Sequence, residues 1–408
     1  MPFTAYRGVT KLADDIELRG HLAALLRLEN TGVLLGAGAS APAGGRTMTA
    51  LWDDFLSRDR EAASWLKDQN FINDTAIADP PDRTSPNMEQ LVDDLAIALH
   101  EWNRQAHADK EKLKTVQASL FRTIIRAAIL QENWWITPGG TEADEEFLTQ
   151  HRVLLQKMVA ARQPGQASPW IFTTNYDLAI EWAAESIDLQ VVNGFLGIHG
   201  RRFSPQSFDI GFRNIQARGE ARFGVYNIYL AKLHGSLSWR EEHGQIFELP
   251  APLAWTHINS FLNDTNRTEL GLMVLPRAAK YLETVGFVLG ELLRRFSEFL
   301  SRPQTCLLAC GYGFGDEHIN RLLRSALLNP TLQLVAYFPS FDGDPQSPKL
   351  PVALRKILSL NNPRVTIVGG GAEAHLDKLV THLPDPLLYD DEMRRLAQIL
   401  RPEPNGPT

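Results

Sequence analysis

The chain is poor in cysteine and has neither a long hydrophobic run nor an excess of positive charge. Its two cysteines cannot supply the four thiolates of a four-cysteine zinc module. No apolar run approaches the roughly eighteen residues of a membrane-spanning helix, and the N-terminal sequence MPFTAYRGVTKLADD has no apolar signal core, so we expect a cytoplasmic protein. The formal net charge of -7 argues against a general nucleic-acid binder, which normally has a basic surface.

The cysteines and the histidines follow no metal-binding pattern. Cys306 and Cys310 stand in the apolar run TCLLACG, where their spacing places both on one face of a strand, and we interpret them as buried structural thiols. His100, His107 and His151 match no zinc spacing, and we interpret them as isolated surface or helix histidines. We therefore expect no metal site.

The rest of the composition is that of a globular protein, in which strand-like and helix-like segments alternate. We expect strands at residues 170–173, 189–192, 228–233, 272–275, 305–310, 332–338 and 365–368, and helices at 47–58, 178–187, 281–301, 317–328 and 376–382. This alternation predicts an α/β fold with a doubly wound, mostly parallel Rossmann-like sheet.

One long interruption of this alternation predicts a large helical insertion. Apolar residues recur there at helical spacing. The three stripes are Met88, Leu91, Val92, Leu95 and Leu99; Leu113, Val116, Leu120, Ile124 and Ala128; and Leu148, Leu155, Met158 and Val159. We divide the chain into an exposed N-terminal arm with the first strand and helix (1–60), the helical insertion (61–165), the remainder of the Rossmann-like domain (166–390) and a C-terminal tail (391–408).

The first fragment that indicates a ligand site is GVLLGAGASAPAGG, residues 32–45. Its G-x-G-x-x-A pattern is typical of a dinucleotide-binding turn, in which Gly36 permits a tight turn, Gly38 lets a phosphate approach and Ala41 keeps the helix near the sheet. The helix start would hold a pyrophosphate. The predicted contacts are Gly36, Ala37, Gly38 and Ser40. A purely structural turn fits this pattern equally well.

Two further fragments place polar residues directly after apolar strands. In IFTTNYD (171–177), Thr174, Asn175 and Asp177 follow the strand, although Asn175 and Asp177 equally fit a strand end and a helix cap. In KLHGS (232–236), His234 follows an alternating strand and precedes Gly235. An imidazole there would suit proton transfer from a hydroxyl group near neutral pH.

Two glycine-rich turns complete the set. LLACGYGFG (307–315) is an apolar strand followed by Gly311, Tyr312 and Gly313, and Asp316 then begins a new helix. A glycine run from Gly369 follows the strand VTIV, and it fits either an adenine contact or a plain turn.

Together these fragments resemble the sirtuin catalytic core, and the form Gly-Tyr-x-Phe-x-Asp-x-His-Ile resembles bacterial sirtuin-like defence effectors that consume NAD. The resemblance implies that Asn175 contacts the nicotinamide ribose and orders the attacking water, that Asp177 binds the nicotinamide carboxamide and that His234 is the base. It implies that Gly311, Tyr312 and Gly313 lie near the adenosine. Thr174 stands where the family has glutamine.

The chain departs from protein-deacylating sirtuins in two ways. It has no Pro-Asp-Phe-Arg stretch after the first glycine-rich loop, and it cannot form their four-cysteine zinc module. We therefore expect water as the acceptor. The resemblance then implies an NAD glycohydrolase that needs no metal, cleaves NAD to nicotinamide and ADP-ribose, and depletes NAD when triggered in antiphage defence by abortive infection.

The resemblance also implies control by assembly, because the chain has no recognisable sensor domain. We expect a homo-oligomer, or a HerA-like ATPase as partner, and no membrane or direct nucleic-acid binding. Two alternatives stay open. The chain could be a catalytically silent subunit that senses NAD or ADP-ribose, or a nucleic-acid-acting subunit of a defence complex, since residues 201–222 contain five arginines.

Overall fold

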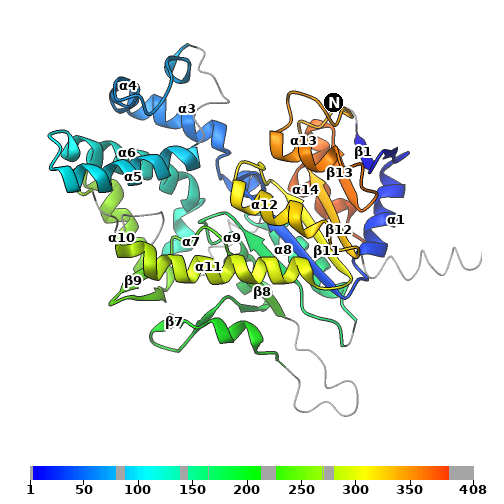
Figure 1. Ribbon diagram of the computed structural model, residues 1–408. Coiled ribbons are helices and arrows are strands. Elements are labelled where there is room, and N and C mark those ends of the chain that lie inside the picture. Colours follow the sequence, from blue (N-terminus) through cyan, green and yellow to red (C-terminus); the bar gives the residue numbers. More distant parts are fainter. Residues whose placement is uncertain are drawn as a thin grey trace, which may run out of the picture.

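The centre of the structure is a nine-stranded, mostly parallel sheet (Figure 1). This computed structural model describes residues 3–79, 88–137, 146–163, 165–212, 227–268, 270 and 280–385. Within them the strand order is β2-β1-β13-β12-β11-β3-β4-β8-β5. The strands are β1 Thr4–Arg7, β2 Thr10–Lys11, β3 Asn30–Leu35, β4 Trp170–Thr173, β5 Gln190–Val192, β8 Asn227–Lys232, β11 Thr305–Cys310, β12 Leu332–Tyr337 and β13 Val365–Gly369.

The strand order defines the edge where a ligand would bind. From β3, the strands β4 and β8 are added on one side, and β11, β12 and β13 are added on the other, all parallel. This is the order of a Rossmann-like sheet, in which ligands bind outside the carboxyl ends of the strands where the direction of addition reverses. The predicted doubly wound, mostly parallel α/β fold is confirmed, and its reversal lies between β3 and β11.

Helices cover both faces of the sheet because side chains alternate along each strand. Leu34 belongs to a hydrophobic cluster with α11, α12 and α13, whereas Val33 and Leu35 belong to a cluster with α1, α8, α9 and α14. These helices are α1 Asp15–Leu25, α8 Thr149–Ala160, α9 Ala179–Glu185, α11 Lys280–Ser301, α12 Glu317–Ala326, α13 Val352–Leu358 and α14 Leu376–His382. None of the helices in the described part of the chain combines the length and apolar character that a membrane span requires.

The two cysteines are part of this core. Cys306 and Cys310 are fully buried on the same face of β11. Burial raises the pKa of both thiols to about 12, so both are protonated at neutral pH. The prediction that they are buried is confirmed.

A group of helices between β3 and β4, which we call the helical lobe, lies to the left in Figure 1, away from α1 and β1. It consists of α3 Met48–Arg58, α4 Arg60–Asp68, α5 Met88–Gln105, α6 Lys110–Ile129 and α7 Glu132–Ile136. The predicted stripes on α5 and α6 face the core: Leu91, Leu95, Leu113 and Leu120 are all buried.

A later helix also joins the helical lobe. Helix α10 (Ala251–Asn263) packs against α6 and α7. The buried guanidinium of Arg122 on α6 donates to the carbonyl oxygens of Phe261 (3.1 Å) and Asp264 (3.0 Å), at the C-terminal end of α10. These bonds satisfy carbonyl groups that a helix end leaves without intrahelical partners. The domain boundaries drawn from the sequence stay predictions.

The expectation of an exposed N-terminal arm is wrong for residues 4–25. Strand β1 pairs with β13 along its whole length, with Thr4 opposite Gly369, and α1 buries Leu18 and Leu22. The segment is therefore an edge of the main sheet together with a covering helix.

A small antiparallel sheet follows β5 and was not expected from the sequence. It has the order β6-β7-β10-β9, formed by β6 Phe195–Leu196, β7 Arg201–Phe203, β9 Trp239–Glu242 and β10 Gln245–Glu248. The predicted strand at 272–275, the tail at 391–408 and residues 213–222 of the arginine-containing segment lie outside the described residues.

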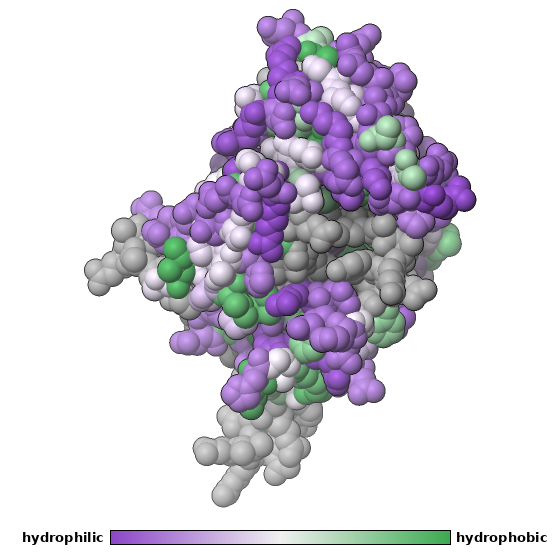
Figure 2. Space-filling view, turned by 90° about the vertical axis from the view of Figure 1, so that its left-hand side faces the viewer, coloured by the Kyte–Doolittle hydropathy of each residue, from purple (hydrophilic) through white to green (hydrophobic). Residues whose placement is uncertain are grey.

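The surface of the helical lobe carries both hydrophilic and hydrophobic residues. Figure 2, which views the left-hand side of Figure 1, shows that the described residues there are mostly hydrophilic, with hydrophobic residues in scattered groups. Helices that bury one stripe and expose the opposite face give this distribution. The expected homo-oligomer stays a prediction.

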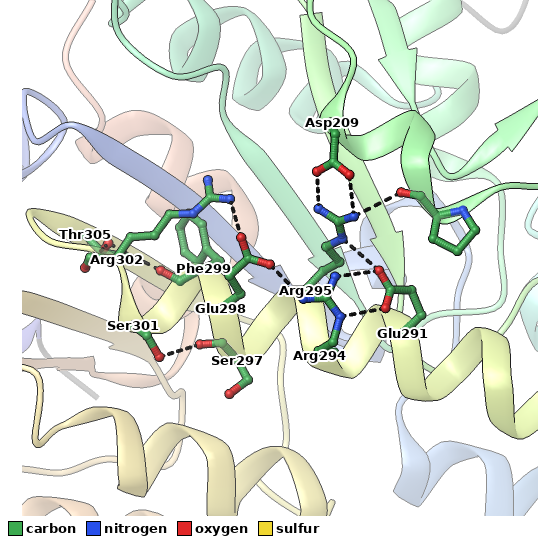
Figure 3. A network of polar contacts seen from close by, with 11 residues as sticks. Asp209, Glu291, Arg294, Arg295, Ser297, Glu298, Phe299, Ser301, Arg302 and Thr305 are labelled. Carbon is green, nitrogen blue, oxygen red and sulfur yellow. Dashed lines mark hydrogen bonds and ion pairs between the residues drawn. The ribbon is translucent and has the colours of Figure 1, made fainter.

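Helix α11 is tied to the segment that follows β7 by a buried arginine (Figure 3). The guanidinium of Arg295 donates to both carboxylate oxygens of Asp209 (2.5 and 2.9 Å), to Glu291 (2.8 Å) and to the carbonyl oxygen of Pro205 (3.1 Å). Its side chain is 7% exposed, whereas that of the neighbouring Arg294 is 54% exposed. The planar fork of arginine suits such a bidentate contact.

We predict that Arg295→Ala lowers the free energy of unfolding by about 2 kcal/mol, because it removes charge-assisted bonds from a buried position. Arg294→Ala is the matched control, since Arg294 bonds Glu291 and Glu298 at the surface and its loss should cost at most about 0.5 kcal/mol. Urea denaturation of both variants measures the difference. Equal costs would show that the contact with Asp209 does not stabilise the fold.

Candidate active site

The predicted site residues follow one row of paired residues across the sheet. Leu35 of β3 pairs with Cys310 of β11 and with Thr173 of β4, and Thr173 pairs with Lys232 of β8. Every predicted site residue except Gly369 lies within the five positions that follow this row. The structure therefore brings the four fragments to one edge, at the point where the order of the sheet reverses.

Asn175 and His234 occupy equivalent places on neighbouring strands. Each is the second residue after its member of the row, Thr173 or Lys232, and parallel strands lie about 4.8 Å apart. Backbone bonds extend the pairing beyond the row, from the N–H of Leu233 to the oxygen of Thr173 (2.8 Å) and from the N–H of Thr174 to the oxygen of Leu35 (3.0 Å). The side chains of Asn175 and His234 are both partly exposed.

The glycines of the first and fourth fragments are explained by contact between their loops. A Cβ on Gly36 would lie 2.5 Å from the oxygen of Gly311, and one on Gly38 would lie 2.9 Å from its Cα. The N–H of Gly38 donates to the oxygen of Gly311 (3.0 Å). The residue Gly311 itself has a φ of +65°. A side chain at any of these three positions would separate the loops.

Two expectations for the first loop are wrong. Gly36 has a φ of -114°, which any residue adopts, so close approach rather than a tight turn requires glycine there. Ala41 is exposed, and the residue that packs on the sheet is the buried Ala39. The short helix α2 (Ala37–Ser40) begins at Ala37. The pyrophosphate contact with Gly36, Ala37, Gly38 and Ser40 stays a prediction.

A hydrogen-bonded chain joins the first and second fragments. The amide nitrogen of Asn175 donates to the oxygen of Gly36 (3.0 Å) and to Ser40 Oγ (2.8 Å), and Ser40 Oγ donates to Asp177 Oδ2 (2.7 Å). Ser40 is 3% exposed. The hydroxyl of Ser40 is thus used in bonds within the protein. The nitrogen of the Asn175 carboxamide is also used in this way, so the oxygen of that carboxamide is the atom that would accept a bond from a ligand.

Asp177 has a structural role that the sequence left open. Its Oδ1 accepts from the N–H of Ala179 (3.1 Å) at the start of α9, and the residue is 7% exposed. His151 of α8 is buried nearby, and burial lowers its pKa to about 4 although the negative charge of Asp177 opposes this shift. His151 is therefore a neutral, buried helix histidine. The contact between Asp177 and nicotinamide stays a prediction.

The buried ammonium group of Lys232 bonds the backbone of the second fragment. Its ammonium group, 3% exposed, donates to Glu181 Oε1 (3.0 Å) and to the backbone oxygens of Tyr176 (3.5 Å) and Asp177. The oxygen of Tyr176 also accepts a hydrogen bond from the N–H of Leu237 (3.0 Å). A buried cation is tolerated only when it is paired and hydrogen-bonded, and these acceptors satisfy it. Lys232 thus fixes the loop that contains Asn175.

His234 is paired with an acidic residue of the fourth fragment. Its Nε2 lies 2.7 Å from Asp316 Oδ2. Burial would raise the pKa of Asp316, but the bond and the charge of His234, together with backbone N–H groups, hold this pKa below its usual value. Asp316 is consequently ionised at neutral pH.

The remaining predicted residues differ in how far they are open to a ligand. The ring of Tyr312 is buried, and its hydroxyl donates to Asn320 Oδ1 (3.0 Å), whereas Gly313 is exposed. Gly369 ends β13, three strands from β3 or about 14 Å away, and a Cβ there would collide with Phe341. Packing therefore explains the glycine at 369, and its adenine contact stays a prediction.

Residues 169–355 match the family model of the SIR2-like domain. The match supports a sirtuin-like family for this chain, and SIR2-like domains use NAD. It includes Asn175, Asp177, His234 and the Gly311 loop but not the loop from Gly36 to Ser40, which sheet pairing brings to the same edge. No curated protein matches the chain. Within the described ranges, no group of three or more His, Cys, Asp or Glu side chains is placed to hold a metal ion.

Sequence reasoning missed two polar residues of this edge. Lys232 stands inside the KLHGS fragment, and Asp316 stands at a helix start that the sequence did identify, yet neither was given a role. A charged residue inside an otherwise apolar strand is a signal of a buried partner, and it would have singled out Lys232.

We predict that Lys232→Met lowers the free energy of unfolding by about 3 kcal/mol, because it leaves the partly buried Glu181 and two carbonyl groups without their cation. The double variant with Glu181→Gln should recover at least about 1 kcal/mol, since no buried charge is then unpaired. Lys112→Met, which breaks an exposed pair with Glu61 (3.1 Å), is the control and should change stability by at most about 0.5 kcal/mol. Denaturation midpoints measure all three. A Lys232→Met cost no larger than the control would contradict the buried role.

Proposed function

We propose that the protein is an NAD glycohydrolase that cleaves NAD to nicotinamide and ADP-ribose. The observation that supports this most is the placement of Asn175 and His234 at equivalent positions of adjacent strands, directly beyond the row that ends at Lys232. The match to the SIR2-like domain supports NAD as the ligand. The reversal point of the sheet, beside Gly36 and Gly311, is where a dinucleotide binds in Rossmann-like folds.

In the proposed reaction the bond between C1 of the ribose and the nicotinamide nitrogen breaks, and its electron pair leaves with neutral nicotinamide. The ribose passes through an oxocarbenium-like state, as in other glycosyl cleavages. Water adds to C1 and gives up a proton, which His234 accepts. The amide oxygen of Asn175 orients the ribose and the water. Asp177 can still accept bonds from the nicotinamide carboxamide, because an ionised carboxylate offers about four acceptor sites.

We also propose that this activity serves antiphage defence and is triggered through assembly, either of copies of this chain or with a HerA-like ATPase. The proposal comes from the resemblance of the Gly311–Ile319 segment to NAD-consuming defence effectors. Uncontrolled NAD hydrolysis would harm the host cell, so an effector of this kind has to stay inactive until it is triggered.

We predict that Asn175→Ala and His234→Ala each slow nicotinamide release at least about a hundredfold, because each removes a group that positions or deprotonates the nucleophile. His243→Ala, in the exposed turn between β9 and β10, is the matched histidine control and should keep full activity. The assay incubates purified protein with NAD, alone and with the protein encoded beside it, and quantifies nicotinamide and ADP-ribose.

Two results would contradict the proposed function. Unchanged release in both Asn175→Ala and His234→Ala would mean that these residues do not act in the reaction. Saturable NAD binding without nicotinamide release, with and without the neighbouring protein, would instead favour the NAD-sensing alternative.

A further inference from the structure

The pair formed by His234 and Asp316 joins two elements that are far apart in the chain. His234 follows β8, and Asp316 begins α12, yet Nε2 and Oδ2 are only 2.7 Å apart. The two side chains are 19% and 13% exposed. A contact of this length between partly buried groups is a charge-assisted hydrogen bond and is stronger than a bond between neutral groups.

Asp316 is itself held rigidly. Its Oδ1 accepts from the N–H groups of His318 (2.7 Å) and Ile319 (3.1 Å), so it caps the N-terminus of α12. The hydroxyl of Tyr312 donates to Asn320 Oδ1 of α12 (3.0 Å) and lies 3.3 Å from the backbone oxygen of Asp316. One carboxylate oxygen therefore serves the helix while the other faces His234. The carboxylate has little freedom to leave the imidazole.

This arrangement determines which nitrogen of His234 is protonated in the neutral ring. Asp316 is ionised at neutral pH, so it accepts a hydrogen bond and Nε2 must be the donor. Nδ1 is then the basic nitrogen. The positive end of the α12 dipole further favours the negative charge on Asp316.

A second acidic residue, Asp93 of the helical lobe, interacts electrostatically with His234 and Asp316. Burial and the charge of Asp94 raise the pKa of Asp93 on α5, and the charges of His234, Asp316 and His318 also act on it. Asp93, Asp316 and His318 are thus titratable groups whose charges act around His234. Asp316 differs from Asp93 because it reaches the imidazole through a direct hydrogen bond, whereas Asp93 acts on the ring through its charge.

We propose that Asp316 is a positioning residue for His234 in NAD cleavage. This inference rests on the proposed function. Asp316 fixes the ring with Nδ1 as the base, and it stabilises the imidazolium that forms when Nδ1 takes the proton of the attacking water. The proton stays on the imidazole and does not pass to the carboxylate, so the charge of Asp316 is unchanged throughout the step.

The substitution Asp316→Asn tests this inference, because asparagine caps helices as well as aspartate but has no charge and can donate to Nε2. We expect nicotinamide release to fall about 10²- to 10⁴-fold, the range seen when an aspartate that orients a catalytic histidine is made neutral, with little change in KM for NAD. The acid limb of the pH profile should move to lower pH, since loss of the negative charge favours the neutral ring. Asp14→Asn, at the cap of α1, makes the same change far from the site and should leave turnover and profile unaltered.

The ring of His234 can also be followed directly by its histidine NMR signals, which separates this inference from the proposed function. In the wild type the neutral ring should show the proton on Nε2, and in Asp316→Asn its titration midpoint should move to lower pH. Asp93→Asn should move it less, because Asp93 acts on the ring only through its charge. Unchanged turnover in Asp316→Asn, or a neutral ring protonated on Nδ1 in the wild type, would overturn the role of Asp316. A wild type that released no nicotinamide, with and without the neighbouring protein, would refute the proposed function, while the ring's titration would still report the pairing.

Discussion

The site depends on the alignment of four strand ends in one row, formed by Cys310, Leu35, Thr173 and Lys232. A shift of one residue in any of these pairings would turn the side chains of that strand to the opposite face. Contacts made by the loops that follow these strands stabilise the alignment. Glycine backbones of the first and fourth loops touch each other, and the ammonium of Lys232 holds the carbonyl groups of the second. The sheet and its loops therefore fix one another.

Much of this could be predicted from the sequence because each strand that leads into the site is short, apolar and followed at once by polar residues or glycine. Residues 170–173 and 305–310 were predicted with the bounds that the structure has. Since parallel strands share a carboxyl edge, predicting the strands was enough to gather Asn175, His234 and the glycine loops at one place. The prediction needed no knowledge of distances between segments.

What the sequence could not supply were partners distant in the chain and strands too short to show a period. Asp316 meets His234 across 82 positions, and β1 pairs with β13 across more than 350, and no local pattern encodes either contact. The strands of the small sheet have two to four residues, no more than the shortest run in which alternation can be recognised. The sequence explained Gly36 by a tight turn and Gly38 by the approach of a phosphate, whereas the structure shows that close contact with Gly311 requires both glycines.

Exposure divides the polar residues of this edge into two kinds. Ser40, Asp177 and Lys232 are at most 7% exposed, and their bonds go to the protein, so they shape the loops. Asn175 and His234 are partly exposed, and each is restrained by a polar neighbour, Ser40 or Asp316, that bonds one polar atom of the group. A group restrained in this way loses little entropy when a substrate binds and keeps its reactive atom in place. The arrangement therefore favours catalysis through Asn175 and His234, with the buried residues as the frame that orients them.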